Sequence, residues 1–501
     1  MKKWLKKWRD SSKKSKEEPQ NITELFDSAQ KSEDFIHYEL VNSHGSLWIS
    51  YFKTLVDMET LHRDVLPFLQ KCQKYSLKEI KGIIPIEKLT ITKDFDLIMD
   101  KFLKGYIIIQ LDKKDDECLL IKALSSTGRE VAAPEIEFSV LGPKEAFVES
   151  LDTNIHLIRK KLPSIHLNTK EMRIGSTSKT RINVLYMDNI ANEENVQTVI
   201  QRIENIEFDQ ISDSSFITQL IADNQNSPFP QLIDTERPDR VASVLGEGKV
   251  AILVDGSPQV LIGPTNLLEF FSAFEDYFLN WHIATTFRLI RMFSVFFSVL
   301  ATPIYVAVMT FHYELIPKDL LSTLITSRST VPFPPILEAL ILELTIELLR
   351  EAGARLPTKV GQTIGIVGGI VIGTASVEAG LTSNVLLIIV ALSALASFTT
   401  PVYKMGNTIR LIRFPFLFFA QLWGMMGIII CFSFVLVHLL RLESLGRPYL
   451  QPLYPPRVAD FKDTVIRLPF STQSLRPLNL QTKKTERFKK QKAKQKKDID
   501  E

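Results

Sequence analysis

The feature that most constrains this chain is a series of long apolar stretches between Met292 and Leu440 that contain no Asp, Glu, Lys or Arg. Four of them, residues 292–312, 360–377, 379–403 and 414–440, come close to or exceed the roughly 20 helical residues that cross a bilayer. A soluble core helix with so long a purely apolar sequence would be exceptional, because one face of such a helix normally meets water. The sequence therefore predicts an α-helical polytopic membrane domain over residues 281–440.

The charged residues lie mostly outside this domain. The chain of 501 residues is 45% hydrophobic and 23% charged, but most charges come before Arg291 or after Arg441. A net charge of +3 with both signs mixed argues against a nucleic-acid-binding protein. Three widely spaced cysteines, Cys72, Cys118 and Cys431, argue against a disulfide framework or a structural zinc site and favour a reducing compartment.

Residues 21–280 have the pattern of a soluble mixed α/β region. Helix-like stretches, such as residues 54–72 and 194–206, alternate with strand-like runs rich in β-branched and aromatic residues. The strand-like runs are residues 47–52, 106–111, 119–123, 136–141, 181–186 and 250–254. The length of the region favours two subdomains, with a possible break near residues 162–170, where Pro163 and polar residues interrupt the pattern.

Enzyme motifs are missing from the sequence. It contains no Walker A loop, GxGxxG, GxSxG or HExxH, and no pair of histidines has the spacing of metal ligands. The run Gly246-Glu247-Gly248-Lys249 predicts a tight turn before the strand at Val250 rather than a phosphate-binding loop. We therefore expect a protein that is not an enzyme, without catalytic, cofactor-binding or metal-binding residues.

The two ends of the chain are basic. Residues 1–20 form an N-terminal arm in which eight of the first sixteen residues are Lys or Arg, and no apolar run of a signal peptide follows. Trp4, Leu5 and Trp8 share one helical face, which suits either a segment lying on an anionic membrane surface or a solvated basic arm. Residues 441–501 form a C-terminal segment with a polybasic tail. Basic ends of this kind indicate a cytoplasmic location.

A stripe of glycines marks the segment at residues 360–377. Gly361, Gly365, Gly369 and Gly373 follow one another at i+4 and repeat the GxxxG motif along one side of the helix. Such a stripe allows close backbone approach, either inside one subunit or between copies around a central axis. The same helix carries Gln362, Thr363 and Thr374, polar groups that a water-lined pathway would use.

An amphipathic acidic helix is predicted at residues 334–351. Glu343, Glu347 and Glu351 repeat at i+4 on one face. Carboxylates near a bilayer normally face protein, water or a cation. One interpretation is a cation-attracting ring formed by several copies; the other is local pairing of Glu347 with Arg350 and of Glu351 with Arg355.

The number of crossings stays open. Basic residues at 350–359 and 404–413 favour a cytoplasmic position for both loops. This requires the acidic helix to cross or to dip deeply, and five simple crossings would put the tail outside. The nine Lys or Arg residues between Lys483 and Lys497 favour a tail inside. Either one segment returns on its own side, or the charge rule fails at one loop.

Several stretches resemble a known family. They are VPFPPILEALILELTIELLREAGARLP from Val331, GQTIGIVGGIVIG, ASFTTP, LGPKEAFVESLDTNIHLIR from Leu141, and NSPFPQLIDTERPDRVASVLGEGKVAILVDGSP from Asn226. Together they cover roughly residues 139–470 and resemble the A subunit of the GerA-type spore germinant receptors. The related A-like protein encoded with the dipicolinate-channel proteins shares the same membrane motifs.

The resemblance implies a multi-pass protein of the spore inner membrane, in contact with membrane lipid, with its N-terminal domain on the cytoplasmic side. It implies a complex with a transporter-like B subunit and a C-subunit lipoprotein, which senses nutrients and triggers release of monovalent cations at germination. Self-associated A subunits would form or gate the ion channel; the alternative is a non-conducting scaffold that transmits the signal.

Overall fold

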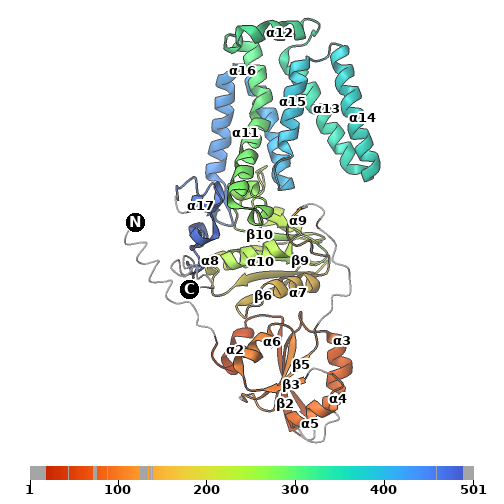
Figure 1. Ribbon diagram of the computed structural model, residues 1–501, viewed down its shortest axis with the longest axis vertical. Coiled ribbons are helices and arrows are strands. Elements are labelled where there is room, and N and C mark those ends of the chain that lie inside the picture. The colour runs from red at the N-terminus through yellow and green to blue at the C-terminus, as the bar shows by residue number, and fades with distance from the viewer. Residues whose placement is uncertain are drawn as a thin grey trace, which may run out of the picture.

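The computed structural model describes residues 19–42, 45–70, 76–86, 89–113, 115–124, 134, 137, 139–457 and 460–488, and excludes the side chains of residues 42, 358–367 and 462. Two α/β units and a helical domain follow one another along the longest axis, with the helical domain at one end (Figure 1). The Trp4, Leu5 and Trp8 face and most of the polybasic tail lie outside the described residues.

The first α/β unit is an antiparallel sheet with helices on both faces. Its strands lie in the order β1 (Phe35–Asn42), β2 (Gly45–Phe52), β4 (Tyr106–Gln110), β5 (Cys118–Lys122) and β3 (Leu89–Thr92). Its helical segments are α2 (Ile22–Ala29), α3 (Met58–Thr60), the π-helix η1 (Leu61–Val65), α4 (Leu66–Gln70), α5 (Leu77–Ile83) and α6 (Phe95–Phe102). Successive side chains of β4 point to opposite faces of the sheet. Ile107 and Ile109 therefore pack in the hydrophobic core on one face, and Ile108 packs in the core on the other.

The second α/β unit repeats this plan. Its antiparallel strands lie in the order β6 (Leu167–Ile174), β7 (Thr180–Met187), β9 (Val250–Val254), β10 (Val260–Gly263) and β8 (Ile233–Thr235). Helices α7 (Leu151–Lys161) and α10 (Pro238–Glu247) pack on one face, and α8 (Glu193–Glu204) and α9 (Ser214–Leu220) on the other. The predicted turn before Val250 is confirmed, because Gly248 ends α10 in the left-handed conformation with φ 99°.

Two expectations for this region are corrected. The break does not fall near residues 162–170, because α7 and β6 on either side of that stretch belong to one hydrophobic core. Residues 137 and 139–141 of the strand-like run 136–141 form no strand. Polar contacts hold this stretch instead: Glu137 pairs with Arg240, and Ser139 accepts a hydrogen bond from Arg237. Arg237 is the N-cap residue of α10, and Arg240 lies in the first turn of this helix.

A buried ion pair joins the two α/β units. Arg159 of α7 donates through Nε to Asp34 Oδ2 at 2.6 Å and through Nη2 to Asp34 Oδ1 at 2.5 Å. Ser32 and Thr54 also donate to the Asp34 carboxylate, each at 2.7 Å. Burial by itself raises the pKa of Asp34, but the charge of Arg159 and these hydrogen bonds outweigh burial and lower it.

The helical domain contains α11 (Trp281–Phe311), α12 (Lys318–Arg328), α13 (Pro335–Arg355), α14 (Thr358–Glu378), α15 (Asn384–Ser397) and α16 (Tyr403–Arg441). Among the described residues, α11 and α16 are long and apolar enough to cross a membrane. Residues 360–377 lie in α14. Residues 379–403 do not form one long helix, because Gly380 has φ 67° and Pro401 precedes α16, so that α15 has 14 residues.

Helix α16 reverses direction in its middle. Gly424 has φ 59° and ψ −137°, a non-helical conformation open to glycine. Thr408 donates to Pro228 O at 2.5 Å, and His438 Nε2 lies 2.8 Å from Ser227 Oγ. Both halves of α16 therefore start or end at the same loop of the second α/β unit. The expected single span at residues 414–440 is thus a helical hairpin with its tip at Gly424.

The passes through the helical domain alternate in direction. Helix α11 leaves the α/β units, α13 returns, α14 leaves and α15 returns, and the two halves of α16 leave and return (Figure 1). Glu338, at the start of α13, accepts a hydrogen bond from Ser383 N just before α15, far from the α/β units. Arg350, near the end of α13, bonds Asn407 at the base of α16. An even number of passes brings the C-terminal segment, residues 442–488, back onto the α/β units. It packs there through Tyr449 and Leu450.

Candidate functional site

Three carboxylates of α13 face the other helices and are paired with arginines. Glu338 is fully buried, lies 2.9 Å from Arg328 of α12 and accepts from Ser383 N at 3.0 Å. Glu343 is also buried, and Glu347 is partly buried. Because an unpaired charge in an apolar environment is very costly, each carboxylate depends on its arginine.

The Glu343 contact is the most enclosed of these pairs. Its Oε2 pairs with Arg413 of α16, and its Oε1 accepts from Thr302 of α11 at 3.0 Å. Arg413 also donates to Ser298 Oγ of α11 at 2.8 Å. Both charged side chains are at most 3% exposed. Polar groups of α11, α13 and α16 thus meet inside an otherwise apolar bundle.

A second cluster lies closer to the α/β units. Glu347 Oε2 lies 2.7 Å from Arg350, and its Oε1 lies 3.5 Å from Arg410 of α16. Asn407 accepts from both Arg350, at 3.0 Å, and Arg410. Glu351 is different: it is exposed and pairs with Arg355 at 2.6 Å. Of the three predicted glutamates, Glu343 and Glu347 contact other helices, whereas Glu351 has no such contact with the side chains that the structure describes.

The predicted glycines all lie on α14, which packs on α13 and stands at the side of the bundle (Figure 1). An added Cβ at Gly369 would meet no atom within 4 Å, and one at Gly373 would only touch Leu387 at 3.9 Å. The tight contact within the subunit is at Gly368, where a Cβ would lie 2.7 Å from Leu349. Gly369 therefore faces open space in the single chain, while Gly373 lies against Leu387 of α15.

Of the three polar residues predicted to line a pathway on α14, the structure describes the side chain of Thr374. Thr374 is exposed, and its hydroxyl donates back to Ile370 O of its own helix at 2.8 Å. Gly361, Gln362, Thr363 and Gly365 lie within residues 358–367, whose side chains are outside the described part.

Sequence reasoning missed the partners of the acidic helix. The sequence does not mark Glu338 as a paired residue. The charge rule assigns Arg410 and Arg413 to a cytoplasmic loop and not to contacts with the acidic helix. The available signal was their position beside an apolar run, where a charged side chain is expected to face protein and to find a partner.

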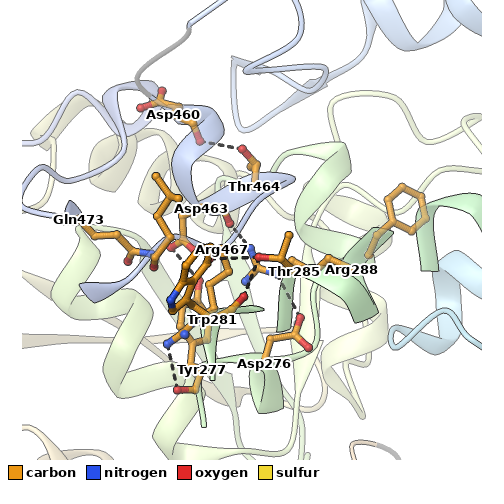
Figure 2. Close-up of polar contacts among 12 residues, drawn as sticks. Asp276, Tyr277, Trp281, Thr285, Arg288, Asp460, Asp463, Thr464, Arg467 and Gln473 are labelled. Atoms are coloured by element: carbon orange, nitrogen blue, oxygen red, sulfur yellow. Dashed lines mark hydrogen bonds and ion pairs between the residues drawn. The ribbon is translucent and has the colours of Figure 1, made fainter. Parts of the chain in front are cut away.

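A polar cluster connects α11 with the second α/β unit and the C-terminal segment (Figure 2). Asp276, at the end of the second unit, is fully buried; its two oxygens lie 2.7 Å from Arg291, and it accepts from Arg288 at 3.2 Å. Arg288 also bonds Asp463 of the short helix α17 (Phe461–Thr464) through the main-chain oxygen. Two arginines of α11 thus hold both neighbouring segments.

Tyr277 and Arg467 complete this cluster. The Tyr277 hydroxyl donates to Asp463 Oδ2 at 3.0 Å, and the guanidinium groups of Arg288 and Arg467 each lie 5.6 Å from the centroid of its ring. Arg467 O accepts from Thr285 of α11 at 3.2 Å. Burial raises the pKa of Asp463 even though Arg288 opposes this effect. Movement of α11 would therefore have to disturb buried, mutually dependent contacts.

The described residues contain no group of three His, Cys, Asp or Glu side chains that could hold a metal ion. The polar clusters instead consist of carboxylates already matched to arginines. Such an arrangement can hold the helices in register. When a pair separates, it can also leave a charged group free to bind an ion.

The chain is similar to known proteins over most of its length. A family profile described as "Bacillus/Clostridium GerA spore germination protein" matches residues 20–479. Spore germination protein GerQA of Bacillus cereus is 53% identical over 468 residues, which cover 93% of this chain and 94% of the relative. Spore germination protein KA of Bacillus subtilis is 38% identical, covering 91% of this chain and 85% of the relative.

Similarity also extends to solved structures. One of them is the crystal structure of the N-terminal domain of the A subunit of the Bacillus megaterium spore germinant receptor GerK3. It is 27% identical in sequence, covers 48% of this chain and 92% of its own, and has a TM-score of 0.37.

Proposed function

This chain belongs to the GerA family of spore germination proteins, and we propose that it serves as the A subunit of a nutrient receptor in the spore inner membrane. In this role it works with a transporter-like B subunit and a C-subunit lipoprotein and performs no enzymatic reaction. The basic ends of the chain favour the cytoplasmic side for the α/β units and the C-terminal segment. The even number of helical passes is compatible with both ends on that side.

The proposed activity is to form or gate a pathway for cations released at germination. The observation that carries it is the pairing of Glu343 with Arg413 inside apolar helices, where Thr302 and Ser298 add hydroxyl groups. Ionisable residues in such a place are rare and typically mark ion pathways. When the arginine moves away, the carboxylate is left to attract a cation.

Self-association through α14 would complete the pathway. The open space beside Gly369 fits a second helix at close distance, whereas Gly373 already faces Leu387 of α15. Exposed apolar side chains flank these glycines: Ile370 is 62% exposed and Val371 is 55% exposed. In a bilayer these side chains can contact either lipid or a neighbouring copy.

The alternative is a non-conducting scaffold. It is favoured by the same ion pairs, because every carboxylate of α13 discussed above is already neutralised by an arginine. In that case the pairs only fix the helices, and the junction around Arg288 transmits a movement of the α/β units to another subunit that conducts.

Ion flux separates these two functions. The chain is purified with its B and C subunits, reconstituted into potassium-loaded liposomes, and potassium efflux is measured before and after addition of the nutrient. We expect efflux that Glu347→Gln slows and Glu351→Gln leaves unchanged, since Glu347 contacts Arg410 of α16 whereas Glu351 is exposed and pairs with Arg355 of its own helix. Equal efflux from the parent and from Glu347→Gln would favour the scaffold.

A further inference from the structure

An apolar groove lies between α11, α12 and α15, at the end of the helical domain that is far from the α/β units. It has a volume of about 290 Å³ and is open along one side. One wall is α11, and the others come from Ile316, from Leu324 of α12 and from Ile389 of α15. Helix α12 lies across this end of the domain (Figure 1). None of the described lining residues belongs to α13, α14 or α16, so this α12 groove is separate from the acidic helix and the glycine stripe.

The α11 wall follows one face of the helix. Phe297, Ala301, Ile304 and Val308 line the groove at positions i, i+4, i+7 and i+11. The small side chain of Ala301 leaves a hollow in the middle of this wall. From Phe297 to Val308 the helix rises about 16 Å, which is roughly half of the 30 Å thickness of the hydrocarbon core. The groove therefore runs through the depth of one leaflet.

The walls of the groove offer carbon atoms rather than hydrogen-bonding groups. Tyr305 contributes the one hydroxyl among the described lining side chains. This hydroxyl lies 3.3 Å from Ser383 Oγ and thus already has a partner. Because no polar group is left to orient a polar ligand, the groove suits an apolar occupant.

Helix α12 has little else to hold it in place. None of its residues is buried, and its end is tied to α13 by the pair of Arg328 with Glu338. Leu324 packs partly on the core that contains Tyr305. An unfilled space beside Leu324 would leave its atoms without contact partners on one side, so an occupant of the groove would stabilise α12 on the bundle.

We propose that the α12 groove binds one acyl chain of a membrane phospholipid, in the leaflet on the side away from the α/β units. An acyl chain needs no hydrogen bonds, matches the length of the groove, and can enter from the bilayer through the open side. An α-helix of another protein is about 10–12 Å across with its side chains, which is wide for a groove of this volume. The inference rests on the membrane location of these helices and does not require that the chain conducts ions.

The test is native mass spectrometry of the purified full chain in detergent, titrated with dioleoyl phosphatidylglycerol. We expect one lipid to stay bound to each chain. Ala301→Phe should weaken lipid binding at least about tenfold, because the ring fills the middle of the groove. Ala301→Leu, which fills less of it, should have a smaller effect. Ala391→Phe is the matched control, since Ala391 is exposed on α15 and does not line the groove, and it should bind as the parent does.

Probes that carry part of the lipid show which part is recognised. Lysophosphatidylglycerol, with one chain, should compete with the full lipid, whereas glycerophosphoglycerol, with none, should not. A phosphatidylglycerol with a diazirine on one acyl chain should cross-link to Leu324 or Ile389. Competition by the chain-free headgroup, or equal binding by the parent and a folded Ala301→Phe, would overturn the proposal. Loss of the lipid when the B and C subunits bind would also overturn it, because the groove would then be a protein interface. Melting temperatures report whether each variant folds.

Discussion

The ring of Phe419 lies with its centroid 6.4 Å from that of Phe434. In a continuous helix the two residues would be about 22 Å apart along the axis, at 1.5 Å per residue. The contact therefore requires that the halves of α16 pack against each other in opposite directions. This reversal places the C-terminal segment on the same side as the α/β units.

Labelling with a membrane-impermeant thiol reagent should reveal this arrangement in oriented membrane vesicles. In a chain whose cysteines are replaced by serine, Glu79→Cys and Glu443→Cys should react from one side, because both positions belong to the α/β side. Asp319→Cys on α12 should react from the other. All three native positions are exposed. Labelling of Glu443→Cys together with Asp319→Cys would mean that α16 crosses only once.

Replacing Gly424 should destabilise the hairpin. A valine there would have to adopt φ 59°, and its Cβ would lie 2.8 Å from His312 Nε2. The strain of such a conformation costs on the order of 1–3 kcal/mol. We expect Gly424→Val to lower the thermal unfolding temperature in detergent, whereas Gly353→Ala, where an added Cβ meets nothing within 4 Å, should leave it unchanged or raise it. An equal effect of both would argue against a strained turn.

The Glu343–Arg413 pair should be far more sensitive than the Glu351–Arg355 pair. Glu343→Gln leaves the buried Arg413 without a countercharge, which costs about 3 kcal/mol or more of unfolding free energy. Glu351→Gln breaks an exposed pair and should cost less than about 1 kcal/mol. Chemical unfolding in detergent measures both values.

A double replacement, Glu343→Leu with Arg413→Met, is the control for this comparison. It should recover most of the loss, because an apolar pair can replace a buried ion pair. Similar unfolding free energies for the parent and for Glu343→Gln would show that water reaches this pair.

The Asp34–Arg159 contact predicts a dependence of stability on pH. The folded-state pKa of Asp34 lies below its ordinary value of 3.8. The stabilisation is therefore fully present above pH 3.8 and is lost as the pH falls through the lower, folded-state pKa. Asp34→Asn should be less stable than the parent at pH 6, and the difference should shrink below pH 3.8. Melting curves between pH 6 and pH 3 give this difference; a constant difference would contradict the assignment.

The glycine stripe should matter for assembly rather than for the fold of one chain. The site beside Gly369 is open, so Gly369→Leu fits within the subunit. It would, however, separate a helix of a second copy, and lipid offers no hydrophobic compensation. We expect a lower oligomeric fraction by cross-linking and loss of the nutrient response, while Ile370→Leu on the same helix remains normal. Normal assembly of Gly369→Leu would mean that the stripe is neither a subunit interface nor a pore wall.

Local pattern was sufficient for some elements of the α/β units, such as β4. The alternation of Ile107, Ile108 and Ile109 is visible in the sequence, and it places β4 between two helical layers. The glycine at position 248 likewise predicted its turn. The predicted run at residues 136–141 failed in its described part because ion pairs and hydrogen bonds to distant arginines, not strand pairing, hold that stretch.

The sequence by itself determined where the apolar segments lie, that the α/β region has two parts, and the family, because hydrophobic pattern and motif spacing are local properties. Only the tertiary structure decided that Gly424 reverses α16, that Arg413 reaches Glu343, and that α11, α12 and α15 line one apolar groove. These relationships join residues far apart in the chain. They depend on which helices pack together, and burial then makes each charge find a partner.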